Sequence, residues 1–121
     1  MNLRAGVDLV EISRIRDAIE RHGERFVTRI FTETEQRDSD GRFTSFAARF
    51  AAKEAVAKAL GCGIGTVGWL EIEIRSDENR RPHLYLHGEA QKLAKELGLS
   101  NWSVSLSHTQ SQAIAFVVAI D

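Results

Sequence analysis

The two ends of the chain show the alternation of apolar and polar positions that is typical of β-strands. In residues 3–10, one face would carry Leu3, Ala5, Val7 and Leu9, and the other Arg4, Gly6, Asp8 and Val10. Residues 102–108 alternate in the same way, whereas residues 112–121 are almost continuously apolar. A continuous apolar run is typical of a strand in the middle of a sheet. We therefore expect the last strand to be central, covered on both faces, and joined to its predecessor by a turn at residues 109–111.

The middle of the chain has a helical composition. Residues 43–60 are rich in alanine, lysine and glutamate, and a glycine follows them where a helix would end. Ser13 is the expected N-cap of a shorter helix that Gly23 would end. The remaining segments predict helices at residues 13–22, 24–31 and 88–98 and strands at residues 69–75 and 83–87. Loops are expected at residues 32–42 and 61–68, although TETEQ in the first of them is compatible with one helical turn. Together these elements predict a single α+β domain, residues 1–121, in which a mainly antiparallel sheet packs against the long central helix.

The central helix carries a carboxylate on an aromatic face. At 100° per residue, Phe43 and Phe50 lie within about 20° of each other, and Glu54 lies roughly 20–40° from them. An unpaired buried carboxylate is unfavourable by several kcal/mol, so Glu54 should be neutral, paired or bound to a metal. One interpretation is an ion pair with Lys58, one turn later, of the kind that stabilises many helices. The other is a metal site, which requires a second carboxylate.

Asp8 is the candidate for that second carboxylate. Taken alone, its place on a strand with an apolar opposite face indicates a solvated outward position. Together, Asp8 and Glu54 would suit Mg²⁺, which takes one or two protein carboxylates and leaves its other positions to water and substrate phosphates. Lys53 and Lys58 would then flank the site with charges suited to phosphate.

Glycines and histidines offer weaker candidates. Gly61, Gly63 and Gly65 follow a helix, whereas the glycines of dinucleotide-binding and Walker loops follow a strand and open a helix. A helix C-cap and turn, or a backbone that a ligand can approach closely, are the remaining interpretations. His83 and His87 would lie roughly 13 Å apart on a strand and could not share a metal.

Composition excludes several broad classes of function. A net charge of −1 over 121 residues argues against a general nucleic-acid binder. No apolar run approaches the ~20 residues of a membrane span, and a signal-peptide core is absent. The single cysteine, Cys62, cannot form an internal disulfide and has no evident catalytic partner, so a cytoplasmic location is expected. His108 ends a strand, where ligand contacts are common, although a structural role is equally consistent with its position.

Arginines are frequent near the N-terminus. Arg14 and Arg21 lie seven residues apart on one side of the first predicted helix, and Arg25 and Arg29 follow. One interpretation is a solvated face. The other is a docking surface for an acidic partner, because arginine forms bidentate contacts with carboxylates and phosphates.

Three segments together resemble one family. AGVDLVEISRI near the N-terminus, RFAAKEAVAKALGCGIG in the middle and LSHTQSQAIAFVV at the end are similar to holo-(acyl-carrier-protein) synthase, the short bacterial type of 4′-phosphopantetheinyl transferase. They occur in the family's order and spacing, over essentially the whole chain. The resemblance implies transfer of 4′-phosphopantetheine from coenzyme A to a serine of apo acyl carrier protein, with release of adenosine 3′,5′-bisphosphate. It also implies a homotrimer with active sites at subunit interfaces.

The resemblance also assigns roles to particular residues. It implies catalytic roles for Asp8, Glu54 and Lys58, and it makes Asp8 and Glu54 the Mg²⁺ ligands. It implies coenzyme A contacts at Lys58, Gly61, Ser107 and His108. It implies carrier-protein contacts at Arg14, Arg21 and Arg25. For the serine proton, the candidate acceptors are a water next to the metal and Glu54.

Two residues depart from the family's pattern. Cys62 stands where a threonine is common, and Arg80 stands where a glycine is common. Two other functions stay open at this point, a Mg²⁺-dependent nucleotide or coenzyme A hydrolase and a non-enzymatic module that binds carrier protein.

Overall fold

The computed structural model describes residues 1–121 and contains five strands and five helices. The strands are β1 (Leu3–Glu11), β2 (Ile72–Ser76), β3 (Pro82–Leu86), β4 (Asn101–His108) and β5 (Gln112–Ile120). The helices are α1 (Ile12–His22), α2 (Glu24–Ile30), α3 (Glu33–Ser39), α4 (Phe43–Ala59) and α5 (Gly88–Glu96), with a short 3₁₀ helix, η1 (Trp69–Glu71). None of the helices combines the length and apolar character needed to cross a bilayer.

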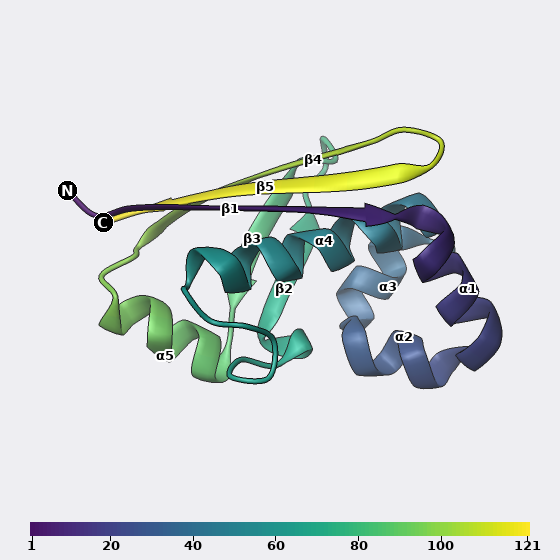
Figure 1. The fold of residues 1–121 in the computed structure, drawn as a ribbon, viewed down its shortest axis with the longest axis horizontal. Helices are drawn as coiled ribbons and strands as arrows, with labels where there is room; N and C mark the ends of the chain where they lie inside the picture. The colour runs from purple at the N-terminus through teal and green to yellow at the C-terminus, as the bar shows by residue number, and fades with distance from the viewer.

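The strands form two antiparallel sheets. One has three strands in the order β1-β5-β4, and the other pairs β2 with β3. In Figure 1, helix α4 runs beneath the three-stranded sheet, α1, α2 and α3 gather near one end of it, and α5 lies near the other. The two termini lie side by side. The predicted α+β class and the central position of the last strand are confirmed.

Small residues let α4 approach the sheet closely. The face of α4 toward the sheet is lined by alanines, including Ala51 and Ala55, which are fully buried. On β1 the closest contact is at Gly6, where an added Cβ would lie 1.9 Å from the carbonyl oxygen of Ala55. A side chain at Gly6 would therefore push β1 away from α4. This close approach brings the neighbouring residues of β1 next to the helix.

The outer face of the three-stranded sheet points away from α4, and its β1 and β5 part is apolar and uncovered. Its six large apolar side chains are between 37% and 61% exposed: Leu3, Val7, Leu9, Ile114, Phe116 and Ile120. The expectation that the last strand is covered on both faces is therefore wrong for the single chain. The apolar run of β5 does supply a buried inner face, Ala113, Ala115, Val117 and Ala119, but Ile114, Phe116 and Ile120 on its other face stay exposed.

Several element boundaries differ from the predicted ones, and two of these differences change the local structure. Helix α1 begins at Ile12 and its N-cap is Glu11, so Ser13 is not the cap and lies within the first turn. Residues 69–71 form the 3₁₀ helix η1 rather than the start of a strand, and β2 begins only at Ile72. The three residues of η1 are too few to show a helical period of their own, so the strand pattern placed this boundary too early.

Residues 32–42, expected as a loop, contain helix α3. Its N-terminus has a capping box, in which Thr32 Oγ1 accepts from the Glu35 amide and the Glu35 carboxylate accepts from the Thr32 amide. Glu35 is fully buried and faces Lys53, whose Nζ lies 2.8 Å from Glu35 Oε1. The same Nζ donates to the carbonyl of Trp69 at 2.8 Å, and the amide of Ile74 donates to Glu35 Oε2 at 2.9 Å. Polar composition therefore concealed a helix that is held by a buried ion pair.

Lys53 accordingly does not flank a phosphate site. Its side chain is fully buried, and burial lowers the pKa of its ammonium despite the neighbouring Glu35 carboxylate. On α4 it points toward α3 and η1, and not toward β1. The expectation that both lysines around Glu54 serve the same site is wrong for Lys53.

Candidate functional site

Asp8 faces α4 and is paired with Lys58. The Lys58 ammonium donates to Asp8 Oδ1 at 3.0 Å and to the carbonyl of Val7 at 2.9 Å. The Asp8 side chain is only 19% exposed, whereas that of Lys58 is about half exposed. The simple interpretation of Asp8 as a residue on a solvated outward face is therefore wrong. The outward face of β1 is instead the apolar one.

Glu54 lies one turn before Lys58 on α4 but does not take its ammonium. Lys58 bonds to Asp8, so the helical pair that spacing alone suggests is not formed. Burial raises the pKa of Glu54, and the nearby Asp8 carboxylate raises it further, while Lys58 and Arg14 oppose the shift. We call Asp8, Glu54 and Lys58 the catalytic cluster, after the role that the family resemblance implies for them. They combine two acidic groups and one ammonium at the contact between β1 and α4.

The aromatic face beside Glu54 is closed by other elements. Phe50 stacks on Trp69 of η1, with ring centroids 4.9 Å apart and an interplanar angle of 28°. The guanidinium of Arg14 lies 5.6 Å from the centroid of the Phe50 ring. The phenylalanine is buried between α1 and η1, whereas Glu54 stays partly accessible at the edge of this packing. A carboxylate is thus tolerated on this side of α4 because it lies at the border of the aromatic contact.

The catalytic cluster fits a divalent cation that also binds substrate. The Asp8 carboxylate helps to raise the pKa of Glu54. Two neighbouring carboxylates of this kind form a natural cation site, and oxygen donors match the preference of Mg²⁺. No group of three or more histidine, cysteine, aspartate or glutamate side chains is placed to hold a metal. Asp8 and Glu54 could therefore supply only part of a coordination shell. Water and phosphate oxygens would have to complete it.

Gly61 lies just beyond the cluster and ends α4. Its φ of 77° is left-handed, and its amide donates to the carbonyl of Lys58 at 3.0 Å. A Cβ at this position would meet the guanidinium of Arg4, which in turn donates to the carbonyl of Ala59. The C-cap residue itself is Leu60, and Gly61 follows it in the left-handed conformation that commonly ends a helix and that glycine adopts without strain.

Ser107 and His108 lie elsewhere in the single chain. They line a cavity of about 630 Å³ between the end of β4, the junction of α3 and α4, and the turn from β2 to β3. Arg49 is the last residue of α4 on this cavity, about 14 Å along the helix axis from Lys58. The structure therefore does not bring Ser107 and His108 to the catalytic cluster of the same chain.

Two of the three predicted carrier-protein contacts share a groove. Arg14 of α1 and Arg25 of α2 line a groove of about 530 Å³, together with Arg29 and His22. Its apolar lining consists of Ile15, Ala18, Phe26, Ile30, Phe50 and Trp69. Arg21 does not line this groove and belongs to the exposed side of α1.

Sequence reasoning missed two residues that shape the site. Gly6 lets β1 approach α4, and a glycine inside a strand was the available signal. Trp69 was assigned to a strand but lies on η1, where its ring supports Phe50 and its carbonyl accepts from Lys53. No local signal in the sequence places this tryptophan against α4, because the contact joins segments that are far apart along the chain.

Comparisons with known proteins agree with this fold. The family model of the 4′-phosphopantetheinyl transferase superfamily matches residues 4–117. Among curated proteins, the chain is 51% identical over 125 residues to holo-(acyl-carrier-protein) synthase of Herpetosiphon aurantiacus, with 98% of both chains covered. It is 48% identical to the enzyme of the same name from Chloroflexus aurantiacus, with 94% of this chain and 95% of the relative covered.

Solved structures give the same result. The holo-(acyl-carrier-protein) synthase of Helicobacter pylori in complex with coenzyme A superposes with a TM-score of 0.88 at 31% identity, covering 96% of this chain and 99% of that one. The synthase of Neisseria meningitidis superposes with a TM-score of 0.87 at 36% identity, covering 98% of both chains. The chain therefore belongs to the 4′-phosphopantetheinyl transferase superfamily, among its holo-(acyl-carrier-protein) synthases.

Proposed function

We propose that this protein transfers 4′-phosphopantetheine from coenzyme A to a serine of apo acyl carrier protein and releases adenosine 3′,5′-bisphosphate. The observation that carries the proposal is the catalytic cluster, in which Lys58 bonds to Asp8 at 3.0 Å beside the partly buried Glu54. Family membership supports the same reaction, as does the coenzyme A bound to the Helicobacter pylori relative.

Asp8 and Glu54 would hold one Mg²⁺ together with phosphate oxygens of coenzyme A. When bound, the ion supplies positive charge that neutralises the pyrophosphate. The half-exposed Lys58 ammonium needs only to turn away from Asp8 to meet a phosphate oxygen. The serine hydroxyl gives up its proton to Glu54 or to a nearby water, and its oxygen forms a bond to the β-phosphorus. The bond from that phosphorus to the bridging oxygen breaks, so the bisphosphate leaves. Positioning and charge stabilisation are the main contributions that a protein makes to such transfers.

The groove between α1 and α2 would receive the carrier protein. Arg14 and Arg25 line it and can form bidentate contacts with carboxylates, while its floor is apolar. An acidic helix with a few apolar side chains would match both features. Because Arg14 also lies over Phe50, next to the aromatic face of α4, a partner in this groove would approach the catalytic cluster.

The outer face of the three-stranded sheet would join subunits in a homotrimer. Monomeric proteins rarely leave large contiguous apolar patches exposed, and here six large apolar side chains share one face. Association would also explain why Ser107 and His108 lie away from Lys58 in a single chain, since a coenzyme A molecule between two subunits could contact both groups. We place the reaction in the cytoplasm, in keeping with the single cysteine.

The intact mass of apo acyl carrier protein tests the reaction directly. After incubation with this protein, coenzyme A and Mg²⁺, the carrier protein should gain one phosphopantetheine group. Consumption of coenzyme A without any gain in carrier-protein mass would instead favour a hydrolase. Binding of carrier protein with neither change would favour a non-enzymatic module.

A further inference from the structure

Arg80 adopts a backbone conformation that is unfavourable for its side chain. It lies in the turn between β2 and β3 with a φ of 63°, in the left-handed region. Asp40 is the one other non-glycine residue with positive φ, and aspartate tolerates that region better than arginine does. A glycine, which is common at the position of Arg80 in the family it resembles, would remove this strain. A strained residue that is held in place by its surroundings points to a functional role for its side chain.

Hydrogen bonds within the turn between β2 and β3 fix the backbone position of Arg80. The Arg80 amide donates to the Asp77 carbonyl at 2.9 Å, and the Asp77 amide donates to the Arg81 carbonyl at 2.9 Å. Asp77 Oδ1 accepts from the amides of Asn79 and Arg81, which tightens the turn further. Arg80 lines the cavity of about 630 Å³ that contains Ser107 and His108, whereas Arg81 lines a different depression beside β3. Two adjacent arginines therefore face different surroundings.

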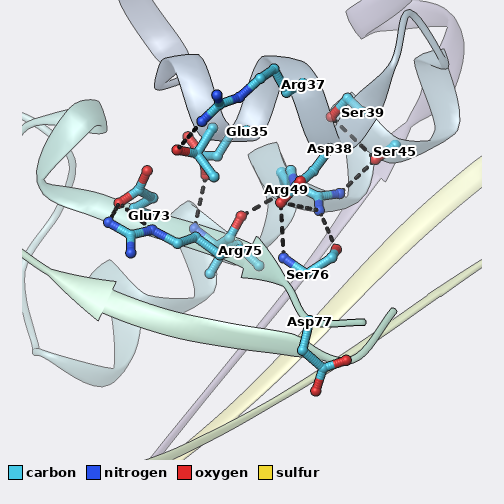
Figure 2. Close-up of polar contacts among 12 residues, drawn as sticks. Glu35, Arg37, Asp38, Ser39, Ser45, Arg49, Glu73, Arg75, Ser76 and Asp77 are labelled. Carbon is cyan, nitrogen blue, oxygen red and sulfur yellow. Dashed lines mark hydrogen bonds and ion pairs between the residues drawn. The ribbon is translucent and has the colours of Figure 1, made fainter. Parts of the chain in front are cut away.

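Of the four arginines on this cavity, the other three already have partners in the protein. Figure 2 shows Arg49 among Asp38, Ser45 and Ser76, and its nitrogens donate to both serine hydroxyls and to a backbone carbonyl. Arg42 donates to two carbonyls at the end of α3, and Arg37 donates to a threonine hydroxyl. Arg80 is the guanidinium on the cavity without a hydrogen bond or ion pair.

The acidic residues that line the cavity do not prevent an anion from binding there. Asp38 accepts from the Ser76 amide at 2.9 Å, and the two carboxylate oxygens of Asp77 accept from its own turn and from His83. Asp40 and Glu78 remain at the rim, so the cavity is not strongly cationic overall. An anion would therefore be held here by a directed guanidinium rather than by net charge.

We propose that Arg80 binds the 3′-phosphate of coenzyme A and increases the preference of this protein for donors that carry it. The inference rests on the proposed function, which places Ser107 and His108 against coenzyme A. In that arrangement the pyrophosphate lies at the catalytic cluster, where the bond is broken. The remaining anionic group of coenzyme A is the phosphate on its ribose, and a guanidinium can hold a phosphate through two parallel hydrogen bonds.

Three variants separate this role from a structural one. Arg80→Gly removes the guanidinium and relieves the left-handed strain, so the variant should fold at least as well as the native chain. Arg80→Lys keeps the charge but not the two-pronged geometry. Arg81→Gln removes the neighbouring charge from the same turn and serves as the matched control.

Titration calorimetry with adenosine 3′,5′-bisphosphate and adenosine 5′-monophosphate measures the effect without any turnover. Arg80→Gly should weaken bisphosphate binding about tenfold, as expected for the loss of charge-assisted hydrogen bonds, and leave monophosphate binding unchanged. Arg80→Lys should fall between Arg80→Gly and the native chain, and Arg81→Gln should match the native chain. In the transfer assay, Arg80→Gly should raise the KM for coenzyme A but not that for 3′-dephospho-coenzyme A.

Two results would overturn the inference. One is an Arg80→Gly variant that binds both nucleotides as tightly as the native chain does, and the other is a variant that binds both more weakly by the same factor. Either result would leave the transfer reaction standing. Absence of phosphopantetheine transfer by the native chain would reject the proposed function instead, whereas the calorimetric comparison would still show whether Arg80 selects the 3′-phosphate.

Discussion

Lys58 is the residue that connects the strand and the helix of the catalytic cluster. Its ammonium bonds to Asp8 and to the Val7 carbonyl, while about half of its side chain stays exposed. In the free chain this pair neutralises Asp8 and leaves Glu54 without a directly bonded cation. A bound cation and phosphate would satisfy both carboxylates and free Lys58 for the substrate.

Replacement of either carboxylate by its amide should reduce transfer while the fold survives. Asp8→Asn and Glu54→Gln keep side-chain size and remove the charge that would hold Mg²⁺. We expect each to lower the rate by about a hundredfold or more, the scale of losing a group that stabilises transition-state charge. Carrier-protein mass over time measures the rate, and thermal unfolding checks the fold. Near-normal activity of either variant at low Mg²⁺ would show that the cation is held elsewhere.

Gly6 is predicted to be intolerant of even one added carbon. In Gly6→Ala, the new Cβ would overlap the Ala55 carbonyl, which belongs to the backbone of α4 and cannot rotate away. The free energy of unfolding should fall by about 1–3 kcal/mol, as for other overpacked interiors, and β1 should move relative to α4. Urea denaturation measures this loss. Gly63→Ala is the matched control, because a Cβ there meets nothing within 4 Å, and an equal loss in both variants would contradict the argument.

At the level of elements, the sequence predicted the long helix and the strands well because each has a strong period of its own. It could not predict partners between elements. Lys53 and Lys58 both neighbour Glu54 in sequence, yet Lys53 is rotated about 100° from it on the helix and meets Glu35 of α3. The need for a second carboxylate suggested Asp8 as the partner of Glu54, and the resemblance to a known family assigned both residues to one Mg²⁺ site. For the same reason the sequence indicated at most one helical turn where α3 lies, since the buried Glu35 finds its partner on another helix.

The contact between α3 and β2 should make the protein sensitive to acid. Burial alone would raise the pKa of Glu73, but hydrogen bonds from Thr32, Arg75 and His87 lower it to about 2. A carboxylate whose pKa is lower in the folded state than in the unfolded state, about 4.3, stabilises the fold above that higher value. This contribution should be lost as the pH falls from about 4.3 towards 2.

Urea unfolding as a function of pH tests this linkage. The native chain should lose stability across that acidic window, and Glu73→Gln should be less stable at neutral pH but lose less on acidification. Glu89→Gln, a change at an exposed residue of α5, serves as the control and should follow the native profile. Identical acid profiles for the native chain and Glu73→Gln would mean that Glu73 does not couple the fold to pH in this window.

The groove between α1 and α2 makes a further prediction at the level of elements. Arg14→Glu and Arg25→Glu reverse charge inside the groove, whereas Arg21→Glu does so outside it. The first two variants should raise the KM for carrier protein and flatten its dependence on salt, because charged contacts weaken as salt screens them. Arg21→Glu should have the smaller effect, and coenzyme A binding should barely change in all three. If the groove variants lost coenzyme A affinity but kept the native KM for carrier protein, the groove would bind coenzyme A and not carrier protein.

At the scale of the whole molecule, the outer face of the three-stranded sheet is the feature that a single chain leaves unexplained. Alternation in β1 correctly predicted two faces but could not say which one is inside, because apolar residues occupy the outer face and the inner one carries Gly6 and Asp8. An apolar face turned away from the core has the character of a subunit interface. Contacts between subunits, and not the core of the single chain, would then explain why the outer face of the sheet is apolar.

Charge introduced on this outer face should therefore separate the subunits. We expect Phe116→Glu to convert a trimer into monomers in light scattering, with an unchanged circular dichroism spectrum and a loss of transfer activity. Leu70→Glu places the same charge on another exposed apolar residue, away from this face, and should leave the assembly intact. A native chain that is a fully active monomer at assay concentration would reject the trimer.

Mixing two inactive variants tests whether active sites are shared between chains. Lys58→Ala and His108→Ala should each be poorly active alone, because every site in a uniform assembly lacks one group. In a mixed assembly, the Lys58 of one chain can meet the His108 of its neighbour, so a fraction of the sites regains both groups and activity should return. If each site were built within one chain, every site would still lack a group after mixing. Activity that stays at the level of the separate variants, in mixtures shown to exchange subunits, would therefore place Ser107 and His108 outside a shared site.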